Sequence, residues 1–363
     1  MNITIIAGAR PNFMKVAPII KEISNCQKNG VNIHYRLVHT GQHYDRNLSG
    51  AFFEDLKIPF PDINLNIKSG SQAVQTAAIM VAFEKELLKN PTDLVLVVGD
   101  VNSTMACAIV AKKMHIKVAH VEGGIRSFDI SMPEEINRML TDSISDYFYV
   151  TSRVAIKNLK KSGIKNDQIC FVGNTMIDTL IANLDNLKQP KIWDEQSLSK
   201  SSYIVLTLHR PSNVDEEGKL KDFIVEIVCS SKGVPIIFPV HPRTKIILDK
   251  LKLNFKNLNY IEPLGYLEFN YLVKNSLCVI TDSGGITEET TYLNIPCLTL
   301  RDSTERPETV IIGTNMLVGT DPKSIGKPMN TILNGNWKSG KVPEFWDGKT
   351  SRRIIKHIIS VSD

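Results

Sequence analysis

The run Leu94-Val95-Leu96-Val97-Val98 constrains the fold more than any other stretch of this chain. An unbroken series of branched aliphatic residues is typical of a strand buried on both faces of a parallel sheet. Parallel neighbours have to be joined by crossover connections, and these are usually helices. We therefore expect a chain in which strands and helices alternate.

The first half of the sequence meets this expectation, because short β-branched or apolar runs alternate with longer amphipathic ones. The expected helices include Ser71–Leu88 and Met105–Met114. The expected strands are Ile3–Ala7, His34–Thr40, Leu94–Val98, Val118–Val121, Tyr147–Val150 and Ile169–Val172. This order is that of a doubly wound α/β domain.

The alternation loosens from about Ile181 to Ser202 and then restarts, so a second α/β domain is expected. Its strands are predicted at Tyr203–Leu208, Pro235–Val240, Leu258–Ile261, Leu277–Thr281, Pro296–Leu300 and Met316–Gly319. A chain of 363 residues is also too long for one ordinary core. We predict an α/β protein with two Rossmann-like doubly wound domains, residues 1–182 and 183–344, whose C-terminal helix in 345–363 packs back on the first.

Composition excludes several classes of protein. Hydrophobic residues at 42% and charged residues at 22% are globular values, and the net charge of +5 is small for this length. The lysines are scattered, so no nucleic-acid or membrane surface is expected. The six cysteines form no CxxC pair, so neither zinc nor redox chemistry is indicated. With no signal peptide or membrane-spanning run, a cytoplasmic protein is expected.

Charged side chains gather where strands of the first domain are expected to end. Asp100 follows the strand Leu94–Val98, and Glu122 follows Val118–Val121. Open α/β sheets bind ligands at this edge, although Asp100 could equally be a helix N-cap. The turn that begins at Gly8 carries Arg10 and Lys15, which suit a phosphate or sugar unless they are only surface charges.

The stretch after Glu122 enters a helix that we predict to begin at Ser131. Ser131 and Glu134 have the spacing of a capping box, with proline between them. Glu134, Asn137 and Arg138 then share one helical face. Together with Arg126 they could serve general acid–base chemistry on a charged substrate. The alternatives are that Glu134 only caps the helix or that it pairs with Arg138 on a solvated face.

The second domain carries groups suited to a nucleotide. Ser283, Gly284 and Gly285 lie between an expected strand and helix, so their backbone N–H groups could meet phosphates. Glu289 could accept hydrogen bonds from ribose hydroxyls. This is neither a GxGxxG nor a Walker pattern. A charged loop at residues 301–308 and His209 follow other strands, and a lone histidine there is more often structural.

At this point the residues resemble the non-hydrolysing UDP-N-acetylglucosamine 2-epimerases. The matching motifs occur in the family's order over most of the chain. They are Gly8-Ala9-Arg10-Pro11 with Lys15, Gly99-Asp100, His120-Val121-Glu122 with Arg126, Pro133-Glu134-Glu135 with Asn137-Arg138, His209-Arg210, Ser283-Gly284-Gly285 with Glu288-Glu289, and Thr304-Glu305-Arg306-Pro307. The resemblance implies the fold of B-type glycosyltransferases, with the site in a central cleft between two domains. Because the acid–base groups are expected in one domain and the nucleotide anchors in the other, we also predict that the domains close on the substrate.

The resemblance also implies the reaction and its residues. UDP is eliminated from a UDP-linked N-acetyl-amino sugar, and re-addition to the 2-acetamidoglycal inverts C2, with no cofactor and no metal. The product would enter the synthesis of cell-surface polysaccharide precursors. The implied catalytic residues are Asp100, Glu122, Glu134 and His209. The implied substrate-binding residues are Arg10, Lys15, Arg126, Asn137, Arg138, Phe269, Ser283, Gly284, Gly285, Glu289 and Arg306. A homodimer is also expected.

Departures from the family pattern leave the substrate and its regulation open. Asn12 stands where many members have Glu, and Tyr44 and Asp45 replace Arg and Glu. Pro211-Ser212 and Ser127-Phe128-Asp129 also differ from the usual motifs, the latter as in epimerases of modified sugars such as diacetamido uronic acids. A UDP-sugar-dependent glycosyltransferase and a hydrolysing 2-epimerase remain as alternative functions.

Overall fold

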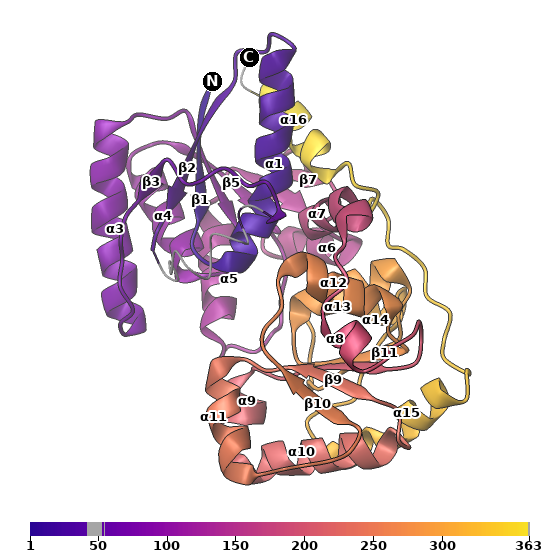
Figure 1. Cartoon of the computed structure of the whole chain (residues 1–363). Helices are drawn as coiled ribbons and strands as arrows, with labels where there is room; N and C mark the ends of the chain where they lie inside the picture. Colours follow the sequence, from indigo (N-terminus) through magenta and orange to yellow (C-terminus); the bar gives the residue numbers. More distant parts are fainter. Residues whose placement is uncertain (42–52, 54, 362–363) are drawn as a thin grey trace. The chain divides into compact units, whose positions relative to one another are not determined.

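A computed structural model describes residues 1–41, 53 and 55–361 of the chain. The chain divides into two compact units, Met1–Ala182 with Glu344–Asp363, and Asn183–Pro343. Each unit has one parallel β-sheet with helices connecting its strands (Figure 1). The expected fold class, two Rossmann-like α/β domains, is therefore confirmed.

The sheet of the first unit has seven parallel strands in the order β3-β2-β1-β4-β5-β6-β7. The strands are β1 (Asn2–Ala7), β2 (His34–His39), β3 (Ile63–Asn64), β4 (Leu94–Val98), β5 (Lys117–Val121), β6 (Tyr147–Val150) and β7 (Ile169–Phe171). Every residue of β4 is buried, as its continuous apolar run predicts. Val98 pairs with Val121, so β4 and β5 end side by side.

The helices of the first unit follow the predicted alternation, with shifts at their ends. Those whose bounds the structure describes are α1 (Arg10–Lys28), α3 (Gln72–Lys89), α4 (Asn102–Lys113), α5 (Pro133–Ile144), α6 (Arg153–Lys161), α7 (Thr175–Asn183) and α16 (Thr350–Ser360), together with the 3-10 turn η1 (Asn166–Gln168). Ser71 caps α3 by accepting a hydrogen bond from the Val74 N–H. α4 begins three residues before the predicted start at Met105.

The C-terminal helix α16 belongs to the first unit and packs against α1 (Figure 1). Its first turn is held by Asp178 of α7. This buried carboxylate accepts hydrogen bonds from the N–H groups of Thr350 and Ser351, at 3.1 and 2.8 Å. Ile354, Ile355 and Ile358 are buried at the helical spacing that the sequence shows.

The second unit has six parallel strands in the order β10-β9-β8-β11-β12-β13. The strands are β8 (Ile204–Thr207), β9 (Ile236–Pro239), β10 (Leu258–Ile261), β11 (Cys278–Thr281), β12 (Cys297–Thr299) and β13 (Asn315–Leu317). Its helices are α8 (Ile192–Glu195), α9 (Pro211–Val214), α10 (Glu217–Ser230), α11 (Pro242–Leu251), α12 (Tyr266–Asn275), α13 (Gly284–Leu293), α14 (Pro307–Ile311) and α15 (Gly326–Leu333), with 3-10 turns η2 (Leu184–Asn186) and η3 (Pro322–Ser324).

The strand order of each sheet reverses once, which defines where a ligand is expected. The chain moves outward in opposite directions from β1 and β4 in the first sheet, and from β8 and β11 in the second. Doubly wound sheets bind ligands at the carboxyl ends of the strands beside such a reversal. The loops after these four strands begin at Gly8, Gly99, Leu208 and Asp282.

No helix among the described residues is both long enough and apolar enough to span a membrane. The departures from the family pattern at Tyr44 and Asp45 lie outside the described residues, as do Gln42 and His43. The side chain of Arg10, the first residue of α1, also lies outside the described part of the structure.

Candidate active site

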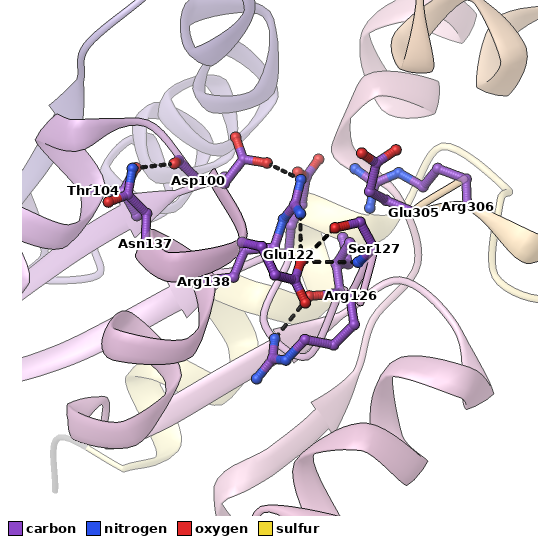
Figure 2. Close-up of polar contacts among 12 residues, drawn as sticks. Asp100, Thr104, Glu122, Arg126, Ser127, Asn137, Arg138, Glu305 and Arg306 are labelled. Atoms are coloured by element: carbon purple, nitrogen blue, oxygen red, sulfur yellow. Dashed lines mark hydrogen bonds and ion pairs between the residues drawn. The ribbon is translucent and has the colours of Figure 1, made fainter. Parts of the chain in front are cut away.

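The end of β4 presents Asp100 beside Arg138. Arg138 Nη2 donates to Asp100 Oδ2 at 2.5 Å, and the Asp100 side chain is still 31% exposed. The N-cap of α4 is Val101, with no side-chain hydrogen bond, so the alternative that Asp100 caps this helix is wrong. Asn137 Nδ2 donates to the Asp100 carbonyl at 2.9 Å. Figure 2 shows Asn137 and Arg138 holding Asp100 through its backbone and its carboxylate.

Glu122 lies immediately after β5 in the left-handed backbone region, with φ +71°. This region is uncommon for a residue other than glycine, and strained residues of this kind concentrate at functional sites. Lys15 of α1 donates from Nζ to Glu122 Oε2 at 2.7 Å. The structure thus brings together two predicted site residues that are far apart in the sequence.

Both structural alternatives for Glu134 are wrong. α5 begins at Pro133 and its N-cap, Met132, makes no side-chain hydrogen bond. The Ser131 hydroxyl donates instead to Asp129 Oδ1 at 2.6 Å, so the predicted capping box does not form. Glu134 is partly exposed, and its side chain makes no hydrogen bond or ion pair with any residue that the structure describes.

Arg138 pairs with Glu135 rather than with Glu134. Its Nη1 donates to Glu135 Oε2 at 2.7 Å. Glu135 also accepts hydrogen bonds from the Ser127 N–H and hydroxyl, and from the Phe128 N–H. Burial would raise the pKa of Glu135, but the hydrogen bonds from Ser127 and Arg138 outweigh it and lower this pKa. Glu135 therefore joins the loop after β5 to the arginine that holds Asp100.

Arg126 is turned toward the interior of the first unit. Its Nη1 donates to Asp142 Oδ2 at 2.6 Å and to the Ile125 carbonyl at 2.7 Å. Burial would raise the pKa of Asp142, but hydrogen bonds and charges from His120 and Arg126 hold it below its ordinary value. The structure places this predicted substrate-binding residue in an ion pair of the protein itself.

Asn12 explains one departure from the family pattern. Its Oδ1 accepts hydrogen bonds from the Gly8 and Ala9 N–H groups, at 3.1 and 2.8 Å. Its Nδ2 donates to the Val98 carbonyl at 3.3 Å. A glutamate could accept from Gly8 and Ala9 but could not donate to Val98, so the amide links the ends of β1 and β4 in a way that a carboxylate cannot.

In the second unit, His209 follows β8 and contacts a buried carboxylate. His209 Nδ1 lies 2.8 Å from Asp282 Oδ1, and the imidazole is 51% exposed. Asp282 also accepts hydrogen bonds from the His209 and Arg210 N–H groups. Burial would raise the pKa of Asp282, but the contacts with His209 and Arg210 lower it. The exposed ring is thus held in a fixed orientation.

The N-terminus of α13 has open space around its two glycines. Its N-cap, Ser283, makes no side-chain capping hydrogen bond. A Cβ atom built at Gly285 would meet nothing within 4 Å, and one at Gly284 would lie 3.7 Å from Arg301 Nη1. The Ser283 N–H donates to Thr281 Oγ1 at 3.0 Å. The N–H groups of Gly284 and Gly285, at the helix N-terminus, are suited to binding phosphate oxygens.

Glu289 is buried in the second unit, and Phe269 is partly buried there. Glu289 is 4% exposed, and Asn270 Nδ2 donates to its Oε1 at 3.4 Å. Burial raises the pKa of Glu289 to about 7, and hydrogen bonds with Tyr266 and Asn270 only partly oppose this. Phe269 is partly buried on α12 and packs on the hydrophobic cluster that also contacts Ile286.

Arg306 precedes α14 and pairs with a carboxylate of α13. Its Nε makes an ion pair with Glu288 Oε1. The nearby Arg301 makes a bidentate pair with Glu305, at 2.8 and 2.7 Å. The structure thus places the guanidinium of Arg306 against the helix whose N-terminus carries Gly284 and Gly285.

Four buried carboxylates that pair with these groups were not predicted from the sequence. Glu135, Asp142, Asp282 and Glu288 all pair with a predicted site residue. Spacing offered one signal, because Asp142 follows Arg138 by four residues and so lies on the same face of α5. Within the described ranges, His, Cys, Asp and Glu side chains form no group of three or more that could hold a metal ion.

Comparison with known proteins identifies the family of this chain. The family described as UDP-N-acetylglucosamine 2-epimerase matches residues 24–359. UDP-N-acetylglucosamine 2-epimerase of Methanocaldococcus jannaschii is 43% identical over 98% of both chains. UDP-2,3-diacetamido-2,3-dideoxy-D-glucuronate 2-epimerase of Pseudomonas aeruginosa is 38% identical over 99% of both.

Solved structures show the same fold. The crystal structure of the M. jannaschii UDP-GlcNAc 2-epimerase in complex with UDP-GlcNAc and UDP has a TM-score of 0.87 and 44% sequence identity. The alignment covers 99% of this chain and 100% of that one. Matches over nearly the whole length, in sequence and in structure, show that this chain belongs to the UDP-N-acetylglucosamine 2-epimerase family.

Proposed function

We propose that this chain is an isomerase that inverts C2 of a UDP-linked N-acetyl-amino sugar without hydrolysing it. One observation supports this more than any other. Asp100 and Glu122 follow neighbouring strands of the first unit, and each is paired with a cation, Arg138 and Lys15 respectively. Removal and return of a proton on opposite faces of one carbon requires acid–base groups of this kind.

The reaction is an elimination followed by an addition. The C1–O bond to the diphosphate breaks, a carboxylate takes the C2 proton, and the electron pair of the C2–H bond forms the C1=C2 double bond. UDP then adds back at C1 while a proton is delivered to the other face of C2. The C2 proton is poorly acidic, so cations that stabilise the departing diphosphate carry much of the catalysis.

We assign the acid–base roles to Asp100, Glu122 and Glu134 of the first unit. The partly exposed Glu134, without a partner among the described residues, suits a proton donor or acceptor for a ligand. Lys15 and Arg138 form ion pairs with the two strand-end carboxylates. We also assign Arg10, Arg126 and Asn137 to the substrate site of the first unit. Arg126 and Asn137 act through their contacts with Asp142 and with the Asp100 carbonyl, respectively.

We assign nucleotide binding to the second unit. Ser283, Gly284 and Gly285 at the N-terminus of α13 suit the diphosphate, with Arg306 as a neighbouring cation. The glycine N–H groups are the backbone donors for it, because the Ser283 N–H already donates to Thr281 Oγ1. His209 is exposed and oriented by Asp282, so it suits a hydrogen bond to the diphosphate or sugar. We assign Glu289 to the ribose and Phe269 to the uracil, as the resemblance implies.

The names of the relatives define two substrates to compare. The M. jannaschii relative is named for UDP-N-acetylglucosamine, and the P. aeruginosa relative is named for a diacetamido glucuronate. Both are UDP sugars with an acetamido group at C2. We propose a substrate of this class for the present chain, acting in the cytoplasm in the synthesis of cell-surface polysaccharide precursors.

We also propose that the protein is a homodimer. Val74, Val81 and Leu88 are exposed on α3 at seven-residue intervals, so they form an apolar stripe along one face of the helix. Met139 and Leu140 of α5 are exposed as well. Exposed apolar surface of this kind is typical of a protein–protein interface, and a second copy of the chain would cover it.

Proton NMR in deuterated water tests the reaction. The pure protein is incubated with UDP-N-acetylglucosamine and, separately, with UDP-2,3-diacetamido-2,3-dideoxy-D-glucuronate. Deuterium at C2 of a UDP-linked product, with inverted configuration, is the expected result for the true substrate. The Glu122→Gln variant serves as the control for exchange that does not depend on the enzyme.

Two other results would contradict the proposal. Release of the free sugar would make the protein a hydrolysing 2-epimerase. No change in either UDP sugar until an acceptor is added would make it a glycosyltransferase.

A further inference from the structure

His120 is a buried histidine whose two ring nitrogens both contact the protein. It lies on β5, two residues before Glu122, and its side chain is 1% exposed. Its Nδ1 lies 2.8 Å from Asp142 Oδ1, and its Nε2 lies 2.9 Å from the carbonyl oxygen of Gly99. A core histidine of this kind needs both contacts, because no water reaches the ring to replace either of them.

The partners of His120 determine how many protons the ring carries. A backbone carbonyl oxygen can only accept, so Nε2 must donate to Gly99. Asp142 Oδ2 already accepts hydrogen bonds from Arg126 at 2.6 Å and from the Gly124 N–H at 3.0 Å. These contacts keep Asp142 a carboxylate, whose Oδ1 can also only accept. Both ring nitrogens of His120 therefore carry hydrogen.

The contacts of His120 connect it to the backbone just before Asp100 and, through Asp142, to the backbone just after Glu122. The Gly99 carbonyl belongs to the peptide unit that leads into Asp100. The Gly99 N–H donates to the Val121 carbonyl at 3.1 Å, so both polar groups of Gly99 are anchored on β5. Asp142, in turn, binds the N–H of Gly124, two residues after Glu122.

Backbone conformation at these positions makes such anchoring necessary. Gly99 and Glu122 both have φ near +71°. A non-glycine residue holds this conformation only where its surroundings enforce it. The pair of His120 and Asp142 supplies fixed contacts at both strand ends.

We propose that His120 is an imidazolium which, held by Asp142, is the positioning residue for Asp100 and Glu122 in the epimerase reaction. It touches neither substrate nor product. It orients the Gly99–Asp100 peptide, while Asp142 orients the turn after Glu122. This assignment rests on the proposed function for its kinetic consequences, but the protonation of the ring follows from the contacts alone.

A matched pair of substitutions separates the two contacts. In His120→Gln the amide nitrogen occupies the place of Nε2 and can still donate to Gly99. In His120→Asn the amide nitrogen occupies the place of Nδ1, so the contact with Asp142 is kept and the contact with Gly99 is lost. A role limited to filling the core would not distinguish the two by kcat once both are folded.

Turnover and UDP binding are measured for both variants, with thermal unfolding as the control for the fold. A misplaced catalytic group costs about a hundredfold, so kcat of His120→Asn should fall about that far while KM and UDP affinity stay near wild type. His120→Gln should keep kcat within about tenfold of wild type. Equal kcat values for the two folded variants would overturn the positioning role.

NMR of the wild-type protein labelled with ¹⁵N-histidine is independent of any variant's folding. The chain has 8 histidines, and the signal of His120 is the one that disappears in His120→Gln. We expect ¹⁵N shifts of two protonated ring nitrogens at neutral pH, and the shift of a neutral ring in Asp142→Asn. A neutral ring in the wild type would overturn the imidazolium assignment. Because this measurement needs no turnover, its failure is distinguishable from failure of the proposed epimerase function.

Discussion

The ammonium group of Lys15 lies 2.7 Å from Glu122 Oε2, and this carboxylate is 3% exposed. A buried charge of this kind is stable only with a partner close by. Lys15 comes from the first helix and Glu122 from the end of a central strand. Their ion pair therefore connects the fold of the first unit to its proposed chemistry.

Replacing Lys15 by methionine should remove this support. We expect Lys15→Met to lower kcat by about a hundredfold, the usual effect of losing a preorganised charge at a reacting centre. Lys21→Met is the matched control, because Lys21 is exposed on the same helix. Steady-state kinetics with both variants would contradict the expectation if the two had similar kcat values.

Glu122→Gln should keep the fold and UDP binding but lose turnover by about a hundredfold, the scale of general acid–base catalysis. The amide oxygen can still accept a hydrogen bond from Lys15, whereas the side chain can no longer take up a proton. Single-turnover kinetics and calorimetry with UDP measure the two properties separately. Near-normal turnover in the folded variant would make Glu122 a structural residue.

Arg306→Ala should weaken UDP binding by about tenfold to a hundredfold, because a hydrogen bond from a charged group contributes about 1.5–3 kcal/mol. Glu134→Gln, in the other unit, should leave UDP affinity unchanged and slow the chemical step. Isothermal titration calorimetry with UDP alone compares the two variants. Unchanged affinity for Arg306→Ala would place this arginine outside the nucleotide site.

The stability of the second unit should depend on the protonation of Glu289. Burial raises the pKa of Glu289 from its ordinary value of 4.5 to about 7. Between these values the folded protein retains a proton that the unfolded chain releases, so this group's contribution to stability falls as pH rises from 4.5 to about 7.

Glu289→Gln should therefore raise Tm relative to wild type at pH 8 and have little effect at pH 4.5, where the wild-type residue is protonated in the folded state. Scanning calorimetry without nucleotide measures both. Glu216→Gln, at an exposed position of the same unit, is the control. A gain in Tm that is equal at both pH values would show that the titration of Glu289 is not the cause.

The apolar stripe on α3 should be an interface between two copies of the chain. Val81→Glu is expected to convert a dimer to a particle of 40.6 kDa in analytical ultracentrifugation. Val342→Glu makes the same change at another exposed apolar residue, outside α3, and should leave the dimer intact. A monomeric wild-type protein at micromolar concentration would contradict this prediction.

The sequence predicted the fold because its signals are local. The apolar run Leu94–Val98 forms β4 with the predicted bounds. Asp100 and Glu122 lie at the same edge of the sheet because they follow β4 and β5, which are paired in parallel. The two-residue strand Ile63–Asn64 was missed because it is too short to show a period. Start signals at α5 were misleading, since Asp129 competes for the Ser131 hydroxyl.

The carboxylates that pair with the predicted site residues could not be predicted, because their role depends on which charged side chains become buried together. Asp142 could not be recognised as the partner of His120 and Arg126, because burial is decided by tertiary packing rather than by spacing. The same holds for Arg138, which pairs with Asp100 at the end of β4 and not with Glu134 in its own helix.

The return of the chain into the first unit has a consequence for its synthesis. The second unit is continuous, from Asn183 to Pro343, whereas the first needs residues from both ends of the sequence. Asp178 can accept its hydrogen bonds from Thr350 and Ser351 only after the second piece of this unit has been made. On a ribosome, the second unit can therefore complete its core before the first, which remains accessible to chaperones and proteases until α16 has emerged.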